Sequence, residues 1–464
     1  MGAAAPTVAE QLVRFAVDLS LDAVPVPVRE AARWHFLDAL GVGLAASSLP
    51  STTKLTAGVR HLGAAPESTA FGFAQPLPAA SAALVNGICI HALEFDDTHT
   101  GSVVHGSAVV APAALAAAER VHASGAELLK AIVAGWEVFI RLGLAAPGRF
   151  QERGFQVTAV GGVFAAALIS SLLHRLPVEQ AVHALGIAGS QASGVFEYLA
   201  EGATVKALHP GWAAHGGIVA SYLAQAGMTG PRSIFEGRFG LYRTYAGDGE
   251  AGERLRALAA TLGEEWLLPQ ATYKFYPCCH YIHPFLELAE RLRAEGVAPA
   301  AIEGITCRVP EEEVPIICEP WTRKQRPASG YEARFSLPYC LAVVLLEGKL
   351  DVNTFEAVLD DEPLRDLIGK ISYVPVADSG FPARFPGEMD VRLAGGGVRR
   401  LAVADVRGGV GRPLTAADIQ AKFAANAGRV LPKAAVQGLV DAVGRLEDLP
   451  SVDRLTALLR SAQP

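Results

Sequence analysis

The sequence predicts a mainly α-helical fold, with a large all-α domain, a smaller α+β domain and an active-site cleft between them. Three observations support this. Apolar residues recur every three or four positions through most of residues 1–267. Strand-like alternation begins only after residue 268. Hydrophobic residues make up 51% of the 464 residues and charged residues 19%, as is typical of a globular chain with more than one domain.

The first domain is expected to span residues 1–267 and to consist of helices. Residues 8–17, 28–47, 108–124 and 125–146 each repeat apolar side chains with helical spacing. Gly and Pro residues separate these segments, as they do between helices. Strand signals are nearly absent, so we expect an all-α domain.

The second domain is expected to span residues 268–400 and to combine helices with a small sheet. Period-two alternation predicts strands at 302–310, 370–377, 388–394 and 398–406, with Gly395–Gly397 as the turn of a hairpin. Helical spacing predicts helices at 283–296, 335–350 and 352–370. Residues 401–464 are helical in pattern and are expected to return to the first domain, which makes that domain discontinuous.

Composition narrows the classes of partner. The net charge is -7 and no basic stripe is visible, so no nucleic acid is expected. The longest apolar run, residues 157–173, is rich in Gly, Ala and Ser and lacks flanking anchors, which predicts a buried core helix and no membrane. The first residues lack the pattern of a secretory leader, so we expect a cytoplasmic protein.

The six cysteines are scattered and form no CxxC pair. This spacing predicts neither a metal framework nor a disulfide scaffold, and we expect reduced, mostly buried thiols. A metal centre built on cysteine is therefore not expected.

The stretch HALEFDDTHTGSVVH, residues 91–105, gathers titratable side chains directly after an apolar segment. If this stretch is helical, then His91, Glu94, Phe95 and Thr98 share one face. Such a face could line a site, but a solvated acidic helix end has the same composition.

Two adjacent carboxylates in that stretch, Asp96 and Asp97, point elsewhere on the helix. They could cap the following helix, act on a substrate, or, together with Glu94, bind a divalent metal. The metal alternative explains neither the histidines nor the next two motifs.

The second motif is ATVKALHPGWAAHGG, residues 203–217. Lys206, His209 and His215 are its polar side chains of some length, in an apolar and Gly-rich surround. Lys206 and His209 are three residues apart and would face one cavity if the chain is helical up to Pro210. A lysine here is a suitable cation for a substrate carboxylate, although a surface lysine beside two structural histidines would have the same spacing.

The third motif is YKFYPCCHYIHP, residues 273–284. Lys274, His280 and His283 cluster near the predicted domain junction. A zinc site is disfavoured because contiguous Cys and His residues do not easily converge on one tetrahedral ion. We expect this motif to line the cleft.

Together, these three motifs resemble the MmgE/PrpD family, which includes dehydratases, decarboxylases and epimerases of small di- and tricarboxylates. The resemblance also includes the segments VVHGSAVVAPAALAAAE, AGMTGPRSIFEGRFGLY, EARFSLPYCLAVVLLEG and GRPLTAADIQAKF, in the family's order. It covers nearly the whole chain. It implies a homodimer, and catalysis without a metal or other cofactor.

Site residues follow from the resemblance position by position. Glu94 falls where decarboxylase members have an active-site aspartate, and Thr98 and His105 fall on a threonine and a histidine of that site. Lys206 and Lys274 match two lysines of the same site. The loop before His105 is one residue longer here.

Further substrate contacts are expected at Gln156, His209, His283 and Tyr339. Gln156 stands in GFQVTAV, where the family often has a histidine, and a glutamine cannot titrate. Glu94 is one methylene longer than the family's usual aspartate. Both departures weaken the transfer of one particular member's activity.

The reactions of the family share proton transfer at a carbon next to a carboxylate. His105 is the expected acid–base group because histidine titrates near neutral pH. Lys206 and Lys274 would stabilise the developing negative charge. Asp97 or Glu94 could orient a histidine or act as a second base.

These residue types suit several reactions. We expect a metal-independent lyase of the hydro-lyase type that acts on a small polycarboxylate. An epimerase of an iminodisuccinate-like dicarboxylate and a cis-aconitate-type decarboxylase are the alternatives. A non-catalytic helical scaffold is the remaining one, and the retained lysines and histidine argue against it.

Overall fold

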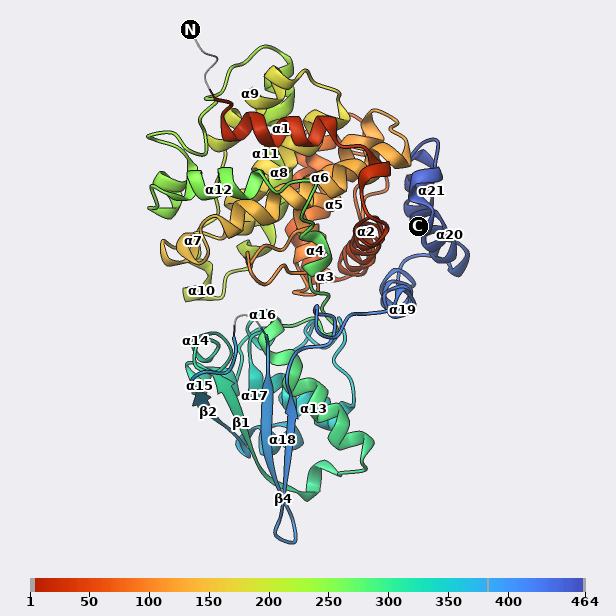
Figure 1. Ribbon diagram of the computed structural model, residues 1–464. Helices are drawn as coiled ribbons and strands as arrows, with labels where there is room; N and C mark the ends of the chain where they lie inside the picture. The colour runs from red at the N-terminus through yellow and green to blue at the C-terminus, as the bar shows by residue number, and fades with distance from the viewer. Residues whose placement is uncertain (1–4, 382–383, 462–464) are drawn as a thin grey trace. The chain divides into compact units, whose positions relative to one another are not determined.

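In the computed structural model, which describes residues 5–381 and 384–461, the chain divides into two compact units (Figure 1). The helical unit comprises Met1–Ala92, Asp96–Thr272 and Thr415–Pro464, and the α+β unit comprises Leu93–Phe95 and Tyr273–Leu414. The predicted boundary after residue 400 is wrong, because it falls inside a strand, Gly397–Val403, that is paired along its whole length. The first boundary lies after residue 272 and not after residue 267.

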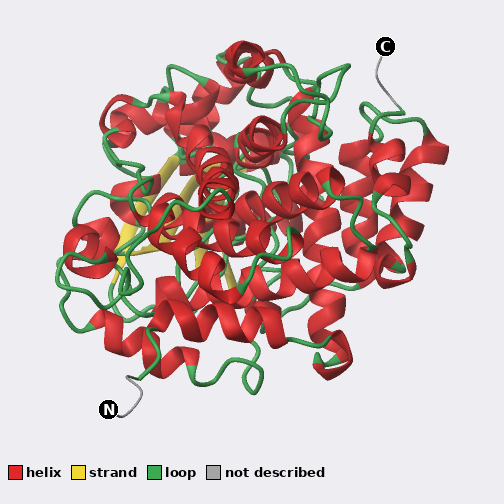
Figure 2. Ribbon diagram, turned by 90° about the horizontal axis from the view of Figure 1, so that it is seen from above, coloured by secondary structure: helices red, strands yellow, loops and turns green. Residues whose placement is uncertain are grey.

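The helical unit is built almost entirely of α-helices, as Figure 2 illustrates. They are α1 (Val8–Asp18), α2 (Val26–Ser47), α3 (Pro50–Thr56), α4 (Ala79–His91), α5 (Ser107–Arg120), α6 (Gly125–Leu144), α7 (Arg149–Glu152), α8 (Val157–Leu173), α9 (Val178–Gly189), α10 (Tyr198–Glu201), α11 (Leu208–Gln225), α12 (Ala251–Ala259), α19 (Ala416–Ala427), α20 (Lys433–Gly444) and α21 (Asp453–Leu459).

The core of this unit is formed around α8, which packs against α5, α6, α9 and α11. Nearly every side chain of α8 is buried, which confirms the expected core helix. Local signals fix the helix ends. The side chain of Ser124 accepts a hydrogen bond from the backbone N–H of Glu127 while Glu127 accepts one from the backbone of Ser124, a capping box at the start of α6.

Helices α4 and α11 cross at very short range because glycines face each other. A Cβ atom on Gly87 would lie 2.5 Å from the Cα atom of Gly211, and a Cβ atom on Gly211 would lie 2.4 Å from the backbone oxygen of Leu84. No side chain fits at either position. This crossing matters for the site, since α4 ends at His91 and α11 holds His209.

The C-terminal helices return to the helical unit. Helices α19 and α20 pack against α2, and Figure 1 shows them beside it in blue. Phe423 of α19 lies over Gly41, where a Cβ atom would meet its ring at 2.9 Å. The unit is therefore discontinuous in sequence.

The α+β unit contains a four-stranded sheet in the order β2-β1-β3-β4. Strands β1 and β2 are parallel, whereas β3 is antiparallel to both β1 and β4. The strands are β1 (Ile302–Pro310), β2 (Ile371–Val376), β3 (Gly387–Leu393) and β4 (Gly397–Val403), and the helices are α13 (His283–Ala294), α14 (Val314–Ile317), α15 (Trp321–Gln325), α16 (Gly330–Ala333), α17 (Leu337–Glu347) and α18 (Glu362–Gly369).

One predicted helix in this unit is shorter than expected. The interval 352–370 contains only α18, and residues 352–361 form turns and extended chain. Asp361 ends that irregular segment by accepting a hydrogen bond from the backbone N–H of Leu364 at 3.0 Å, so the helix starts there. Helix α13 packs on β3, β4 and α17 and buries the centre of the unit.

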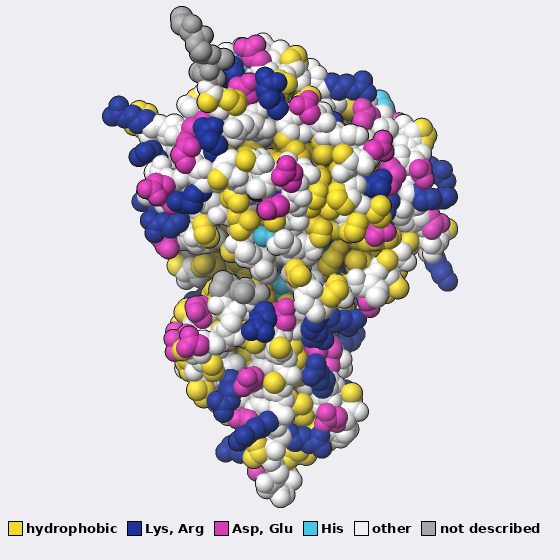
Figure 3. Space-filling view, viewed as in Figure 1, with side chains coloured by type: hydrophobic (Ala, Val, Ile, Leu, Met, Phe, Trp, Pro, Cys, Tyr) yellow, Lys and Arg dark blue, Asp and Glu magenta, His cyan; other side chains and the backbone are white. Residues whose placement is uncertain are grey.

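All six cysteines are buried and unbridged. No helix among the described residues is long and apolar enough to cross a membrane. On the face drawn in Figure 3, acidic and basic side chains are interspersed.

Candidate functional site

The stretch from 91 to 105 is a loop and not a helix. Helix α4 ends at His91, and Glu94 adopts a left-handed backbone conformation with φ 53°. Such a conformation is strained for a residue with a side chain. The condition under which His91, Glu94, Phe95 and Thr98 would share one helical face is therefore not met. Residues Leu93–Phe95 belong to the α+β unit, while Asp96 belongs to the helical unit.

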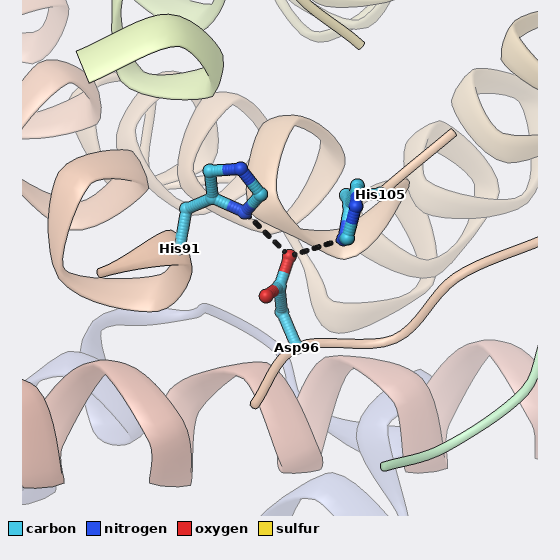
Figure 4. Close-up of side chains that lie close together, drawn as sticks. All are labelled: His91, Asp96 and His105. Carbon is cyan, nitrogen blue, oxygen red and sulfur yellow. Dashed lines mark hydrogen bonds and ion pairs between the residues drawn. The ribbon is translucent and has the colours of Figure 1, made fainter. Parts of the chain in front are cut away.

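In the helical unit, Asp96 binds two histidines with one oxygen. Its Oδ2 atom lies 2.8 Å from Nδ1 of His91 and 3.1 Å from Nδ1 of His105. Figure 4 shows the two imidazole rings approaching this oxygen from opposite sides. Their ring centroids are 4.7 Å apart, with the rings nearly perpendicular. The three side chains form a compact group that we call the His–Asp–His cluster.

The charge of Asp96 sets the tautomers of both histidines. Burial alone would raise the pKa of this carboxyl, but His91 and His105 offset the burial and hold the pKa of Asp96 well below its ordinary value. An ionised Asp96 accepts hydrogen bonds only, so each histidine donates its Nδ1–H. In the neutral form of His105, the Nε2 atom then carries the lone pair.

His105 is also held through its backbone and lies closest to solvent. Its backbone N–H donates to the hydroxyl of Thr158 on α8 at 3.0 Å, and Thr98 Oγ1 lies 3.4 Å from its Nδ1. The side chain of His105 is 14% exposed, whereas that of Asp96 is 0% exposed. Of the cluster, His105 is thus the side chain that a substrate can reach.

Asp97 turns away from the cluster. Its Oδ2 atom lies 2.7 Å from Nδ1 of His35, and its two oxygens accept the backbone N–H and the hydroxyl of Ser107. The adjacent carboxylates therefore have different partners. Asp97 orients a histidine, as one of the expectations allowed, but that histidine is His35 on α2.

Gln156 lies between His91 of the cluster and one further histidine of the helical unit, His209. Its Oε1 atom accepts from Nδ1 of His209 at 2.6 Å, and its Nε2 atom lies 3.5 Å from Nε2 of His91. Burial, together with the neighbouring charges of His91 and Lys206, lowers the pKa of His209 to about 4, so His209 is neutral at pH 7. Lys206 is buried on a short 3-10 turn, Thr204–Ala207, directly before α11.

That turn changes how the second motif is placed. Helix α11 begins at Leu208, so Pro210 lies in its first turn, where proline is tolerated. The chain is therefore not one continuous α-helix from Lys206 to Pro210, which is the condition set for Lys206 and His209 to face one cavity. Nδ1 of His215 lies 3.1 Å from the backbone oxygen of Ala80 on α4, which accepts its hydrogen bond.

In the α+β unit, Glu94 lies beside a buried lysine. Lys274 donates to the backbone oxygen of Glu94 at 3.0 Å, and its Nζ atom lies 3.5 Å from the carboxylate of Glu94. Arg334 is buried too. Burial lowers the pKa of Arg334, and the negative charges of Glu94 and Glu356 oppose that shift. Two buried cations beside one carboxylate make this region suited to an anionic ligand.

The other expected contacts in this unit have neighbours of their own. The hydroxyl of Tyr339 accepts from the backbone N–H of Leu359 at 3.1 Å, and burial raises the pKa of that hydroxyl. The ring of His283 packs on His280 and Tyr276, with centroids 4.8 and 5.1 Å away. These contacts are those of core side chains.

The His–Asp–His cluster is the group among the described residues whose atoms could hold a metal ion. Its nitrogen and oxygen ligand atoms all lie within 4.8 Å of one another. In this structure the three side chains bind one another: the distances of 2.8 and 3.1 Å from Asp96 Oδ2 to the histidine nitrogens are those of direct hydrogen bonds.

Comparison with known protein families identifies the family of this chain. Residues 10–254 match the MmgE/PrpD N-terminal domain and residues 276–448 match the MmgE/PrpD C-terminal domain. The chain belongs to the MmgE/PrpD family. The resemblance of its motifs to this family is thereby confirmed.

Several relatives in the family are named for one activity. Cis-aconitate decarboxylase of Homo sapiens is 31% identical over 417 residues, which cover 86% of this chain and 83% of that one. The cis-aconitate decarboxylase-like protein oryM of Aspergillus oryzae is 26% identical over 468 residues and covers 97% of both chains. Cis-aconitate decarboxylase of Aspergillus terreus is 26% identical over 472 residues, 97% of this chain and 96% of that one. Decarboxylases are lyases, so the relatives support a lyase-type activity.

Sequence reasoning missed two buried side chains near the candidate residues. Arg334 precedes FSLPYC, and an arginine next to such an apolar segment is a signal that could have been used. His35 lies in a helical segment far from the three motifs. Nothing in the local pattern of His35 indicates its bond to Asp97.

Proposed function

We propose that this protein is a lyase that acts on a small tricarboxylate, with His105 as the group that moves the proton. The observation that carries the proposal is the pairing of His105 with a buried, ionised Asp96. A histidine whose Nδ1–H is held by a carboxylate presents a basic Nε2 atom. This is the requirement for proton transfer at a carbon next to a carboxylate.

In the proposed mechanism, Asp96 is the orienting group of His105. It fixes the tautomer and stabilises the imidazolium that forms when Nε2 accepts a proton. Protonated His105 can then return the proton to carbon or to a leaving hydroxyl. Thr98, 3.4 Å from Nδ1 of His105, is a hydrogen-bonding partner for a substrate carboxylate.

Cations provide the second half of the proposal. Lys206, Lys274 and Arg334 are proposed to bind substrate carboxylates. Charge developing next to a carboxylate is stabilised most strongly by cations that are already oriented and shielded from water. Lys274 and Arg334 are 98% and 96% buried, as their exposed fractions of 2% and 4% indicate.

Decarboxylation of cis-aconitate is the first reaction to test, because the relatives quoted above are named for it. A hydro-lyase reaction on a related tricarboxylate is the second candidate. It needs an acid for the leaving hydroxyl, and His105 paired with Asp96 can supply that proton.

The experiment is an NMR assay in deuterated water with cis-aconitate, citrate, 2-methylcitrate, tartrate and iminodisuccinate. Loss of carbon dioxide with deuterium gained at carbon identifies a decarboxylase. Loss of a hydroxyl with an adjacent proton identifies a hydro-lyase, and deuterium exchange without net conversion identifies an epimerase. The absence of both exchange and conversion across the panel would contradict the proposal.

The reaction is also proposed to be metal-independent. Incubation with a chelator followed by gel filtration should leave the rate within about twofold of the untreated protein. A catalytic metal lowers the activation barrier by several kcal/mol, so its removal would slow the reaction far more than twofold. The matched control is a chelated sample to which Zn²⁺ or Mg²⁺ is restored. Loss of activity on chelation and its recovery with metal would overturn this part of the proposal.

A further inference from the structure

A closed ring of contacts lies at the base of the loop that bears His105. Asp97 and Ser107 stand at the two ends of this loop, and they bind each other directly. The backbone N–H of Ser107 donates to Oδ1 of Asp97 at 3.0 Å, and the hydroxyl of Ser107 donates to Oδ2 at 2.5 Å. The hydrogen bonds between Asp97 and Ser107 thus hold the two ends of the loop 98–106 together.

His35 completes the polar part of the ring. Its Nδ1 atom lies 2.7 Å from Oδ2 of Asp97, and both side chains are 1% exposed. His35 adds a third donor to the two of Ser107, and removing it would leave the buried Oδ2 atom of Asp97 with the Ser107 hydroxyl as its one remaining partner among these residues, which weakens the hold on the carboxylate. The neighbouring acid on α2, Asp38, is bound by Lys422 at 2.9 Å and does not compete for that histidine.

Trp136 on α6 closes the ring sterically. Its indole packs on the His35 ring with centroids 5.5 Å apart. On the other side it fills the space beside Gly106, where a Cβ atom would lie 2.1 Å from the indole. Gly106 directly follows His105, so the backbone next to His105 has no room to shift toward α6.

We infer that His35 is a positioning residue for the acid–base group. Through Asp97 and Ser107 it holds both ends of the loop 98–106, and it thereby holds His105 against Asp96. His35 lies outside the candidate substrate contacts and acts only through other residues. The inference rests on the proposed function for its effect on turnover, whereas its effect on the loop is independent of any substrate.

The test compares two substitutions of one residue. His35→Leu keeps the bulk but removes the donor, and His35→Asn places an amide N–H near the position of Nδ1. The exposed histidine His61, replaced by Leu, is the matched control. Each variant is measured by hydrogen–deuterium exchange of peptides that contain residues 98–106, and by kcat and KM on the substrate that the NMR assay identifies.

We expect His35→Leu to increase exchange in 98–106 at least about tenfold and to lower kcat about 100-fold with KM changed less than threefold, because a displacement of about 1 Å in a catalytic group has such an effect. His35→Asn should restore most of both values.

Unchanged exchange in His35→Leu, or no recovery in His35→Asn while both variants remain folded, would overturn the inference. If exchange rises in His35→Leu but the unmodified protein converts nothing in the panel, the positioning of the loop stands and the proposed function falls. If His35→Leu does not fold, the comparison of His35→Asn with the unmodified protein decides, since a positioning role predicts near-normal exchange and kcat in that variant.

Discussion

At the scale of single residues, two adjacent carboxylates differ in what they bind. Asp96 contacts His91 and His105, whereas Asp97 contacts His35 and Ser107. Consecutive residues in a loop point in different directions, so one acid can serve the chemistry while the next serves the backbone. The side chain that orients His105 is therefore Asp96, which composition alone could not separate from its neighbour.

Asp96→Asn tests this assignment. The amide keeps the shape but cannot hold two Nδ1–H donors as a charged acceptor, so His105 loses its preferred tautomer. We expect kcat to fall at least about 100-fold with a far-UV circular dichroism spectrum like that of the unmodified protein. The exposed acid Asp22, replaced by Asn, is the control. A kcat within threefold of normal would remove Asp96 from the mechanism.

Lys274→Met tests the carboxylate-binding role. Charge-assisted hydrogen bonds contribute roughly 1.5–3 kcal/mol, so KM should rise at least about tenfold, and kcat should fall as well because the lysine is also proposed to stabilise the charge that develops in the reaction. Steady-state kinetics on the same substrate provide the measurement, with a thermal unfolding curve to exclude a folding defect. Lys349, whose side chain is 73% exposed, gives the matched Lys→Met control. Equal KM values for the two variants would contradict the role.

At the scale of elements, the site depends on how closely α4 and α11 approach. Gly87→Ala should lower the free energy of unfolding by roughly 1–3 kcal/mol, because the new Cβ atom would lie 2.5 Å from the backbone of Gly211 and one helix must move. Gly58→Ala, where nothing lies within 4 Å, is the control. Urea unfolding measures both. A destabilisation as small as that of the control would mean that the two helices separate without cost.

Elements with a long, unbroken pattern were predictable from the sequence, and those set by turns were not. The apolar run 157–173 is α8 to the residue, and 302–310 is β1. The end of α4 was missed because the titratable residues that follow it keep a helical spacing while the backbone at Glu94 turns left-handed. Residues 352–361 also have helical spacing, yet the cap at Asp361 starts the helix later. In both places a backbone turn overrides a side-chain pattern.

For the candidate site, the sequence predicted which residues belong to it but not which side chains they contact. His105 and Thr98, two of the positions named by the resemblance, are neighbours, and Lys274 lies beside Glu94. The contact of His35 with Asp97 joins positions 62 residues apart, and no local pattern encodes such a pair. The predicted cleft stays a prediction.

At the scale of the whole molecule, buried ionisable groups make stability depend on pH. Glu313 in the α+β unit is fully buried, and neither of its carboxylate oxygens has a hydrogen-bond partner among the described residues. Burial, with a smaller effect of Glu312, raises the pKa of Glu313 from 4.5 to about 9. The folded protein therefore holds a neutral carboxylic acid here at pH 7.

The sign of the pH dependence follows from linkage. Between about pH 4.5 and 9 the folded protein keeps a proton on Glu313 that the unfolded chain releases, so unfolding is favoured as the pH rises. Because of Glu313, the free energy of unfolding should fall by up to about 1.4 kcal/mol for each unit by which the pH rises in this range.

Glu313→Gln removes the titrating proton and keeps the shape of the side chain, and the stability of this variant relative to the unmodified protein should increase steadily from pH 5 to 9. Urea unfolding at pH 5, 7 and 9 measures the difference, with exposed Glu312→Gln as the control. Parallel stability curves for Glu313→Gln and the unmodified protein would show that Glu313 ionises at its ordinary pKa, which its burial in the α+β unit makes unfavourable.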